Sequence, residues 1–190
     1  MEVNPDRLAF VDESIYRSSD GRETYLMAAT LVAPEETAAS TAEMLALRPG
    51  RVGNLHWSKE GATRQQLIVD RIAELALSHL VVVRSSPRRE RPERQRRKCL
   101  EQLCCDLETL TVTRLVIESR GAADDRRDLA TMQSLRAQRR LGPELRMRHE
   151  RGPAQPLLWI ADAVCGAYRS GGSRWEPLRT NTTVIELIEA

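Results

Sequence analysis

Acidic residues at the ends of apolar segments are the first candidates for chemistry in this chain. Asp12 and Glu13 follow the apolar run 8–11 (LAFV), and Glu118 ends the segment 113–118 (TRLVIE). Short apolar runs rich in β-branched residues are typical of buried strands. An unpaired carboxylate buried there costs several kcal/mol or shifts its pKa. These acids therefore either bind a partner such as a metal ion or lie just past the strands, in water.

A further acid lies inside an apolar segment. Asp162 stands in LLWIADAVCG (157–166), between Ala161 and Ala163. Aspartate has poor helix propensity, and on so apolar a helix we expect its side chain to face protein. Carboxylate oxygens are the ligands that Mg²⁺ and Mn²⁺ take, and a pair of such ions can activate water for phosphodiester cleavage. A hydrogen bond to the backbone or an ion pair with arginine is the structural alternative for Asp162.

The elements that must position these acids follow from hydrophobic periodicity and turn residues. Residues 8–32 predict a β-hairpin. We expect strands over 51–58 (at an edge), 79–84, 113–118 and 144–149 (at an edge), and helices over 38–47, 61–78, 99–111, 124–141 and 156–171. Residues 182–188 fit either a strand or a helix. A hairpin followed by alternating helices and strands predicts an α/β fold. Its mixed sheet has an N-terminal antiparallel hairpin and then parallel strands joined by crossover helices, within one domain over 1–190.

The charge of the chain is segregated. The net charge is +2, but residues 84–98 carry eight Arg or Lys against two Glu, and residues 126–151 carry eight Arg against three acids. The best candidates for contacts with a phosphate backbone are Arg88, Arg89, Arg91, Arg94, Arg96, Arg97 and Lys98. The stretch holds no aromatic residue, which favours duplex or structured nucleic acid over base stacking on single strands. A solvated loop is the alternative.

Composition narrows the class of protein. No apolar run is long enough to span a membrane, and the polar start MEVNPDR is unlike a signal peptide. The four cysteines lack paired CxxC spacing, which favours free thiols and a cytoplasmic location. Gly-rich phosphate loops, GxSxG elbows and Cys–His pairs are absent from the sequence. Auxiliary roles in proton transfer or phosphate contact fall to His56, Lys59 and His149, and structural roles for the two histidines stay open.

Four segments together resemble the ribonuclease H-like fold: VDES (11–14), TYLMAATLV (24–32), VIES (116–119) and LLWIADAVCGAYR (157–169). More narrowly, they are similar to the bacterial family known as domain of unknown function 3800. That family usually continues Asp-Glu-Ser with glycine, whereas Ile15 follows here. The resemblance implies a metal-dependent nuclease, and ribonuclease H-like enzymes also take an acid from a helix after the hairpin. Glu60 and Asp70 are the candidates for that acid.

The leading hypothesis is therefore a nuclease or phosphodiesterase that binds Mg²⁺ or Mn²⁺ through Asp12, Glu118 and Asp162. Glu13 would be a fourth or outer ligand, and the Arg-rich segments would hold nucleic acid. Strand alternation sends Asp12 and Glu13 to opposite faces, so only one can point into a shared site, and Asp12 is favoured. The alternatives are a non-catalytic nucleic-acid-binding or interaction module on the same fold and a phosphoesterase that acts on small nucleotides.

Overall fold

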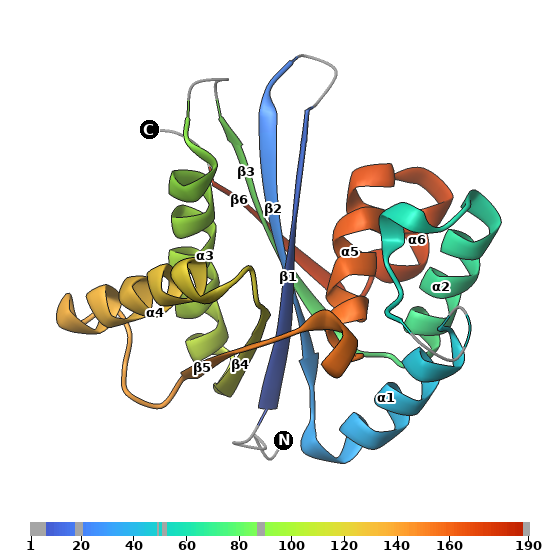
Figure 1. The fold of residues 1–190 in the computed structure, drawn as a ribbon, viewed down its shortest axis with the longest axis horizontal. Helices are drawn as coiled ribbons and strands as arrows, with labels where there is room; N and C mark the ends of the chain where they lie inside the picture. The colour runs from blue at the N-terminus through green and yellow to red at the C-terminus, as the bar shows by residue number, and fades with distance from the viewer. Residues whose placement is uncertain (1–6, 18–20, 49, 51–52, 87–89, 188–190) are drawn as a thin grey trace.

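A six-stranded mixed sheet organises the protein in the computed structural model, which describes residues 7–17, 21–48, 50, 53–86 and 90–187. The strands are β1 (Arg7–Arg17), β2 (Glu23–Val32), β3 (Ser78–Ser86), β4 (Val112–Glu118), β5 (Arg146–Glu150) and β6 (Thr182–Leu187), in the order β5-β4-β1-β2-β3-β6. β1, β2 and β3 pair antiparallel. The pairs β1–β4, β4–β5 and β3–β6 are parallel. The predicted α/β fold with a mixed sheet is confirmed (Figure 1).

Helices cover both faces of this sheet (Figure 1). One face carries α1 (Thr37–Ala46), α2 (Ala62–Glu74), α5 (Leu158–Ser170) and α6 (Gly172–Arg179). The other carries α3 (Pro92–Thr109) and α4 (Ala122–Ala137). Three short 3₁₀ turns complete the described elements: η1 (Pro34–Glu36), η2 (Trp57–Lys59) and η3 (Gly152–Ala154). None of the helices within the described ranges is long and apolar enough to cross a membrane.

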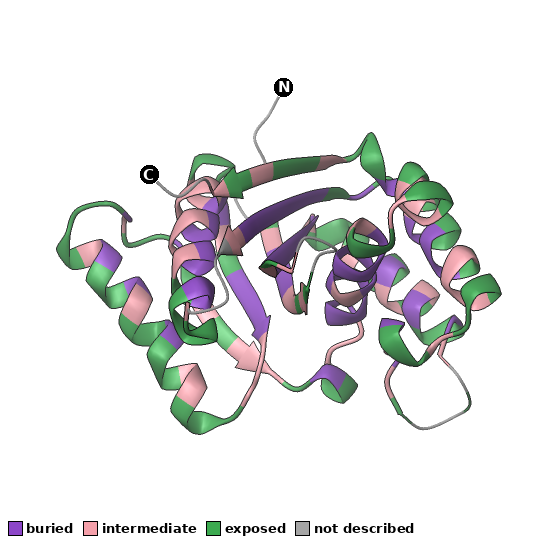
Figure 2. Cartoon of the chain, turned by 90° about the horizontal axis from the view of Figure 1, so that it is seen from above, coloured by how far each residue is buried: buried purple, intermediate pink, exposed green. Residues whose placement is uncertain are grey.

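Buried residues run along the central strands, which lie between helices (Figure 2). The buried side chains form two cores, one on each face of the sheet. On β1, Phe10 packs in the core under α5, whereas Ala9 and Val11 pack in the core under α3. Successive side chains of a strand point to opposite faces. The next two residues continue the alternation, so Asp12 faces α5 and Glu13 faces α3.

One predicted strand is wrong, and one helix is not among the predicted elements. The edge strand is predicted over 51–58, where 51 and 52 lie outside the described residues. The described part, 53–58, forms no strand, because 53–56 are irregular and η2 begins at Trp57. The indole of Trp57 instead packs against Gly166 of α5, where any Cβ would collide with the ring, so the segment crosses a helix and pairs with no strand. The helix over 172–179 was not predicted, because Gly171, Gly172 and Pro177 read as breakers.

The remaining expectations are close to the structure. The hairpin, the edge strand β5 and the helices over 38–47, 61–78 and 156–171 are confirmed within a few residues. Helix α3 begins at Pro92, so the second half of the basic stretch is helical. Parallel pairing with β3 makes the C-terminal segment a strand, β6. All four cysteines are free thiols.

A buried histidine gives the fold a predictable pH dependence. The His79 side chain is 3% exposed, its Nδ1 lies 3.0 Å from Thr30 Oγ1, and burial lowers its pKa from 6.5 to about 4. The unfolded chain therefore binds more protons between these values, and the stability contributed by neutral His79 is lost as the pH falls from 6.5 towards 4. We expect the free energy of unfolding to fall by about 2 kcal/mol from pH 7 to pH 5 through this group. Urea titrations of wild type and His79→Gln measure it, and equal pH dependence in the two would contradict the assignment.

Candidate active site

Two acids of the site come from neighbouring parallel strands. Val11 of β1 pairs with Ile117 of β4, so the next residues, Asp12 and Glu118, lie side by side at the same edge of the sheet. Both share the α5 face, because Phe10 and Val116, two residues earlier on each strand, belong to the core under α5. The two carboxyl groups lie close enough for the charge of Glu118 to raise the pKa of Asp12.

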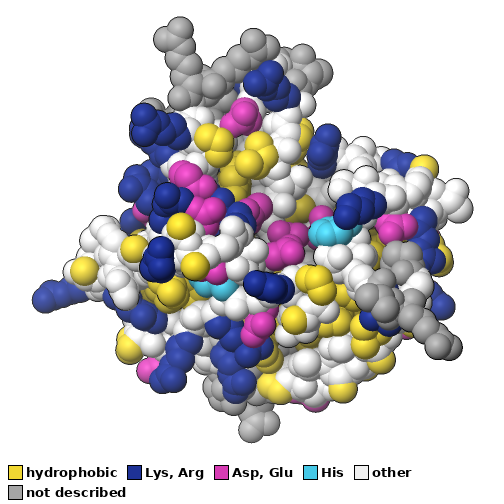
Figure 3. Space-filling model, in the orientation of Figure 1, with side chains coloured by type: hydrophobic (Ala, Val, Ile, Leu, Met, Phe, Trp, Pro, Cys, Tyr) yellow, Lys and Arg dark blue, Asp and Glu magenta, His cyan; other side chains and the backbone are white. Residues whose placement is uncertain are grey.

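The third acid reaches this place from α5. The Asp162 carboxylate accepts a hydrogen bond from the backbone N–H of Trp57 (Oδ2–N 2.9 Å), and His56 Nδ1 lies 3.8 Å from the same oxygen. One turn later, the Cys165 thiol donates to the carbonyl oxygen of Asp12 (3.6 Å), which holds α5 against β1. Figure 3 shows acidic side chains beside a histidine at the centre of this face of the molecule. The structure thus brings together Asp12, Glu118 and Asp162.

Burial raises the pKa values of all three carboxyl groups, and a neighbouring acid raises those of Asp12 and Glu118 further. The pKa of Asp12 is raised well above its ordinary value by burial and then by repulsion from Asp162 and Glu118, against a hydrogen bond from the Glu13 N–H (2.8 Å). Burial and Asp162 also raise the pKa of Glu118. Burial raises the pKa of Asp162 despite the Trp57 N–H and His56. A site that resists negative charge in this way favours protons or cations.

Two residues that the sequence does not mark as functional, Asn54 and Gly152, lie beside the carboxylates. The Asn54 side-chain amide lies 2.7 Å from His56 Nε2, and since an amide nitrogen only donates, Nε2 accepts and Nδ1–H faces Asp162. Gly152 of η3 lies over Glu118: a Cβ there would be 2.5 Å from Glu118 Oε1 and 3.2 Å from Asn54 Nδ2. No spacing pattern marks Asn54 or Gly152, because only tertiary contacts bring their loops to the strand ends.

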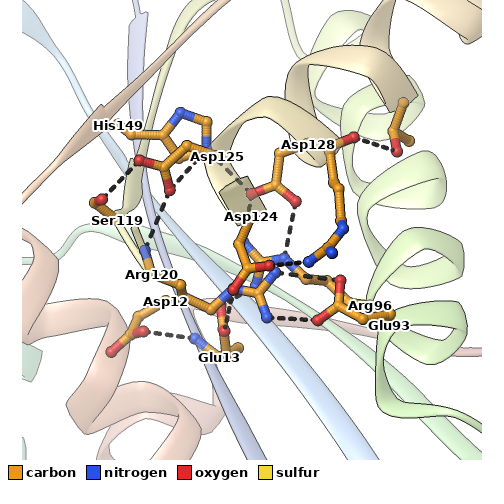
Figure 4. Close-up of polar contacts among 12 residues, drawn as sticks. Asp12, Glu13, Glu93, Arg96, Ser119, Arg120, Asp124, Asp125, Asp128 and His149 are labelled. Carbon is orange, nitrogen blue, oxygen red and sulfur yellow. Dashed lines mark hydrogen bonds and ion pairs between the residues drawn. The ribbon is translucent and has the colours of Figure 1, made fainter. Parts of the chain in front are cut away.

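Glu13 belongs to a different network, on the α3 face (Figure 4). Its carboxylate pairs with Arg96 and lies 3.4 Å from Arg120. Arg96 also donates two hydrogen bonds to Asp128 (Nε–Oδ1 2.9 Å, Nη2–Oδ2 2.7 Å). Burial alone would raise the pKa of Asp128, but hydrogen bonds from Arg96 and His149 lower it to about 2. The assignment of Glu13 as a metal ligand is therefore corrected: arginines already neutralise it, on the other face.

Two more predicted site residues, His149 and Arg96, also belong to the network on the α3 face. His149 lies on β5 beside Ile117 of β4 and contacts Asp128 (Nε2–Oδ2 3.0 Å), so it is on the α3 face, away from Asp162. Arg96 is 1% exposed and engaged with Asp128 and Glu13, so it cannot contact a phosphate backbone.

The other predicted residues lie at the surface or outside the residues that the structure describes. Arg88 and Arg89 are outside the described residues. Exposed or partly exposed side chains are those of Lys59, Arg91, Arg94, Arg97 and Lys98. The candidates for a helix-borne acid are engaged elsewhere: Glu60 lies 3.8 Å from Arg64, and Asp70 is exposed and bonded to Gln66. Within the described ranges, no group of three or more His, Cys, Asp or Glu side chains has the geometry of a metal site.

The fold matches solved structures of ribonucleases H. Ribonuclease H2 from Pyrococcus horikoshii OT3 aligns over 92% of this chain and 76% of that chain, with a TM-score of 0.52 and 10% identity. A mutant protein of Bst-RNase HIII aligns over 93% of this chain, with a TM-score of 0.50 and 14% identity, and this chain spans about half (53%) of its length. Bst-RNase HIII in complex with Mn²⁺ aligns at a TM-score of 0.43, a likeness too weak to support an argument.

The protein therefore has a ribonuclease H-like fold. At these identities the likeness concerns the fold alone. No protein-family model and no curated protein sequence matches the chain, so the resemblance to domain of unknown function 3800 is not supported.

Proposed function

We propose that the protein is a divalent-metal-dependent nuclease that hydrolyses phosphodiester bonds at Asp12, Glu118 and Asp162. The observation that carries the proposal is the convergence of three carboxyl groups from β1, β4 and α5. Burial raises the pKa values of all three, and the charge of Asp162 raises those of Asp12 and Glu118 further. Asp128, a buried acid on the other face of the sheet, is by contrast paired with Arg96. The likeness in fold to ribonucleases H makes nucleic acid the favoured substrate class.

The donor set suits Mg²⁺ or Mn²⁺. Both ions prefer carboxylate oxygens, and a cation would remove the repulsion that raises the pKa of Asp12. Glycine at 152 lets the Glu118 carboxyl group keep its place, because a Cβ there would lie 2.5 Å from Oε1. Asp12, Glu118 and Asp162 would hold the ion. When bound, it would supply a Lewis acid and lower the pKa of bound water.

The residues around the acids prepare the site in their own right. The Trp57 N–H and His56 hold the Asp162 carboxylate in one orientation, and the Glu13 N–H does the same for Asp12. Asn54 sets the tautomer of His56 and leaves its Nδ1–H directed at Asp162. His56 is 35% exposed, so its ring can exchange protons with water beside the acids. These contacts keep the acids positioned for a phosphate that arrives from solvent.

Calorimetric titration with Mg²⁺ and Mn²⁺ tests the metal site. We expect wild type to bind at millimolar concentrations or below and Asp12→Asn/Asp162→Asn to lose binding, because two of three anionic ligands are gone. Absence of binding to wild type, or equal binding to the double variant, would contradict the proposal.

Incubation of labelled RNA, DNA and hybrid duplexes with Mn²⁺ then identifies the substrate. Cleavage that persists in the double variant would indicate a contaminant.

One observation favours a second candidate, a nucleic-acid-binding module without catalysis. The described residues include no group of three or more His, Cys, Asp or Glu side chains with metal-site geometry. Duplex binding without metal binding or cleavage would support this candidate over the first.

A further inference from the structure

A basic groove lies between α3 and α4, on the side of the sheet opposite α5. It has a volume of about 700 Å³. Its exposed cations come from both basic segments of the sequence: Arg94, Arg97 and Lys98 from α3, Arg127 from α4 and Arg140 from just beyond α4. Figure 3 shows Lys and Arg side chains gathered around this part of the molecule. The fold therefore joins two basic segments that are separate in the sequence.

Arg94 and Arg127 are paired with Glu90 and Asp124, but the other three cations of the groove share one acid. Arg97, Lys98 and Arg140 all approach the single carboxylate of Glu101, at 3.6, 3.5 and 3.9 Å. Three like charges around one acid leave a local excess that repels itself unless an anion arrives. The groove thus has the electrostatics of a binding site for a polyanion.

The rest of the lining suits phosphate oxygens better than bases. Thr131, Ser134 and Gln138 add hydroxyl and amide donors, and the described residues that line the groove include no aromatic side chain. Contacts to single-stranded nucleic acid rely on aromatic stacking, whereas contacts to duplex backbones rely on charge and hydrogen bonds. A duplex backbone is therefore the occupant that fits.

The walls of the groove are held at a fixed separation. Beneath the exposed cations, the buried guanidinium of Arg96 on α3 donates two hydrogen bonds to Asp128 on α4. At one end Glu93 accepts a hydrogen bond from Arg120 (2.8 Å), two residues beyond Glu118. The groove is thus preformed, and its Glu93 end adjoins the loop that leaves the carboxylate cluster.

We infer that this groove binds the phosphate backbone of double-stranded nucleic acid and holds the duplex beside the candidate active site. The inference rests on the proposed function for the identity of the substrate. The binding itself needs neither metal nor cleavage, so the two can fail separately.

The test measures binding of a labelled DNA or RNA duplex in EDTA by fluorescence anisotropy, over a range of salt concentrations. Arg97→Ala/Arg140→Ala should reduce the slope of log affinity against log salt by about 2 and weaken binding about fifty- to a hundredfold at 0.1 M salt. The matched control is Arg71→Ala/Arg179→Ala, on α2 and α6. It removes the same charge from side chains of similar exposure, 47% and 67% against 55% and 49%, and should change the slope little.

Glu101→Gln provides a change of opposite sign. It removes the one acid that the three cations share, so binding should tighten severalfold, a result that a merely structural groove would not give. Wild type that fails to bind a duplex at low salt, equal losses in the two double variants, or no change in Glu101→Gln would each overturn the inference. Unchanged duplex binding by Asp12→Asn/Asp162→Asn, with no cleavage by wild type, would overturn the proposed function and leave the groove standing.

Discussion

Arg96→Met is expected to lower the free energy of unfolding by about 3–5 kcal/mol, the usual cost of removing one partner from a buried ion network. The Arg96 guanidinium is 1% exposed and satisfies Asp128 and Glu13 together, and it also donates to the Tyr25 hydroxyl (3.2 Å). Methionine fills much of the same volume but donates nothing. Asp128 would then keep only His149 as a partner, and Glu13 only Arg120. Urea unfolding at pH 7 measures the loss.

The neighbouring arginine offers a matched control. Arg97 is 55% exposed and lies 3.6 Å from Glu101, so Arg97→Met should change stability by no more than about 0.5 kcal/mol. Neutralising the partners as well, in Arg96→Met/Asp128→Leu/Glu13→Gln, should recover a large part of the loss, because the stranded charges are gone. An Arg96→Met variant as stable as Arg97→Met would show that the network contributes nothing to the fold.

Asp12→Asn is expected to change activity and stability in opposite directions. Metal-dependent cleavage should fall by about three orders of magnitude, because a metal ion supplies several kcal/mol of transition-state stabilisation and each 1.4 kcal/mol is tenfold in rate. Stability in EDTA should rise, because asparagine keeps an acceptor for the Glu13 N–H and removes the charge that burial, Asp162 and Glu118 oppose. Initial rates with Mn²⁺ and urea unfolding in EDTA measure the two effects.

The adjacent acid is the control for this pair of effects. Glu13→Gln should lower stability in EDTA, since its carboxylate pairs with Arg96 and Arg120, and should retain metal-dependent cleavage. The two substitutions are chemically the same and one residue apart, so strand alternation alone separates their outcomes. An Asp12→Asn variant that loses stability in EDTA, or that cleaves like wild type, would refute the proposed role of Asp12.

Local signals were enough for most elements of the fold. The apolar runs 8–11 and 113–118 and the turn-rich residues between the hairpin strands identified β1, β4 and β2, because such patterns depend on neighbouring residues. The same reasoning predicts a strand over 51–58, but the described residues 53–58 form none. The ring of Trp57 sits where Gly166 offers no side chain, a contact between distant segments that outweighs strand propensity.

The same contrast between local patterns and contacts of distant segments applies to the candidate site. Asp12, Glu118 and Asp162 stood out in the sequence because acids interrupt apolar segments, and their convergence required only that β1 and β4 be parallel neighbours under α5. His149, Arg96 and Glu13 have comparable residue types and neighbours in the sequence, yet the fold places them in the network on the other face. Residue type indicates which chemistry a side chain can do, whereas the face of the sheet decides with which partner.

The sequence by itself determined the alternation that separates Asp12 from Glu13, because the period of a strand is a property of the backbone. Only the tertiary structure decided that Arg96 and Asp128 meet Glu13, that Asn54, His56 and Gly152 gather around Asp162 and Glu118, and that two basic segments form one groove. These contacts join residues far apart in the chain. They depend on how helices pack across the sheet, which no local pattern encodes.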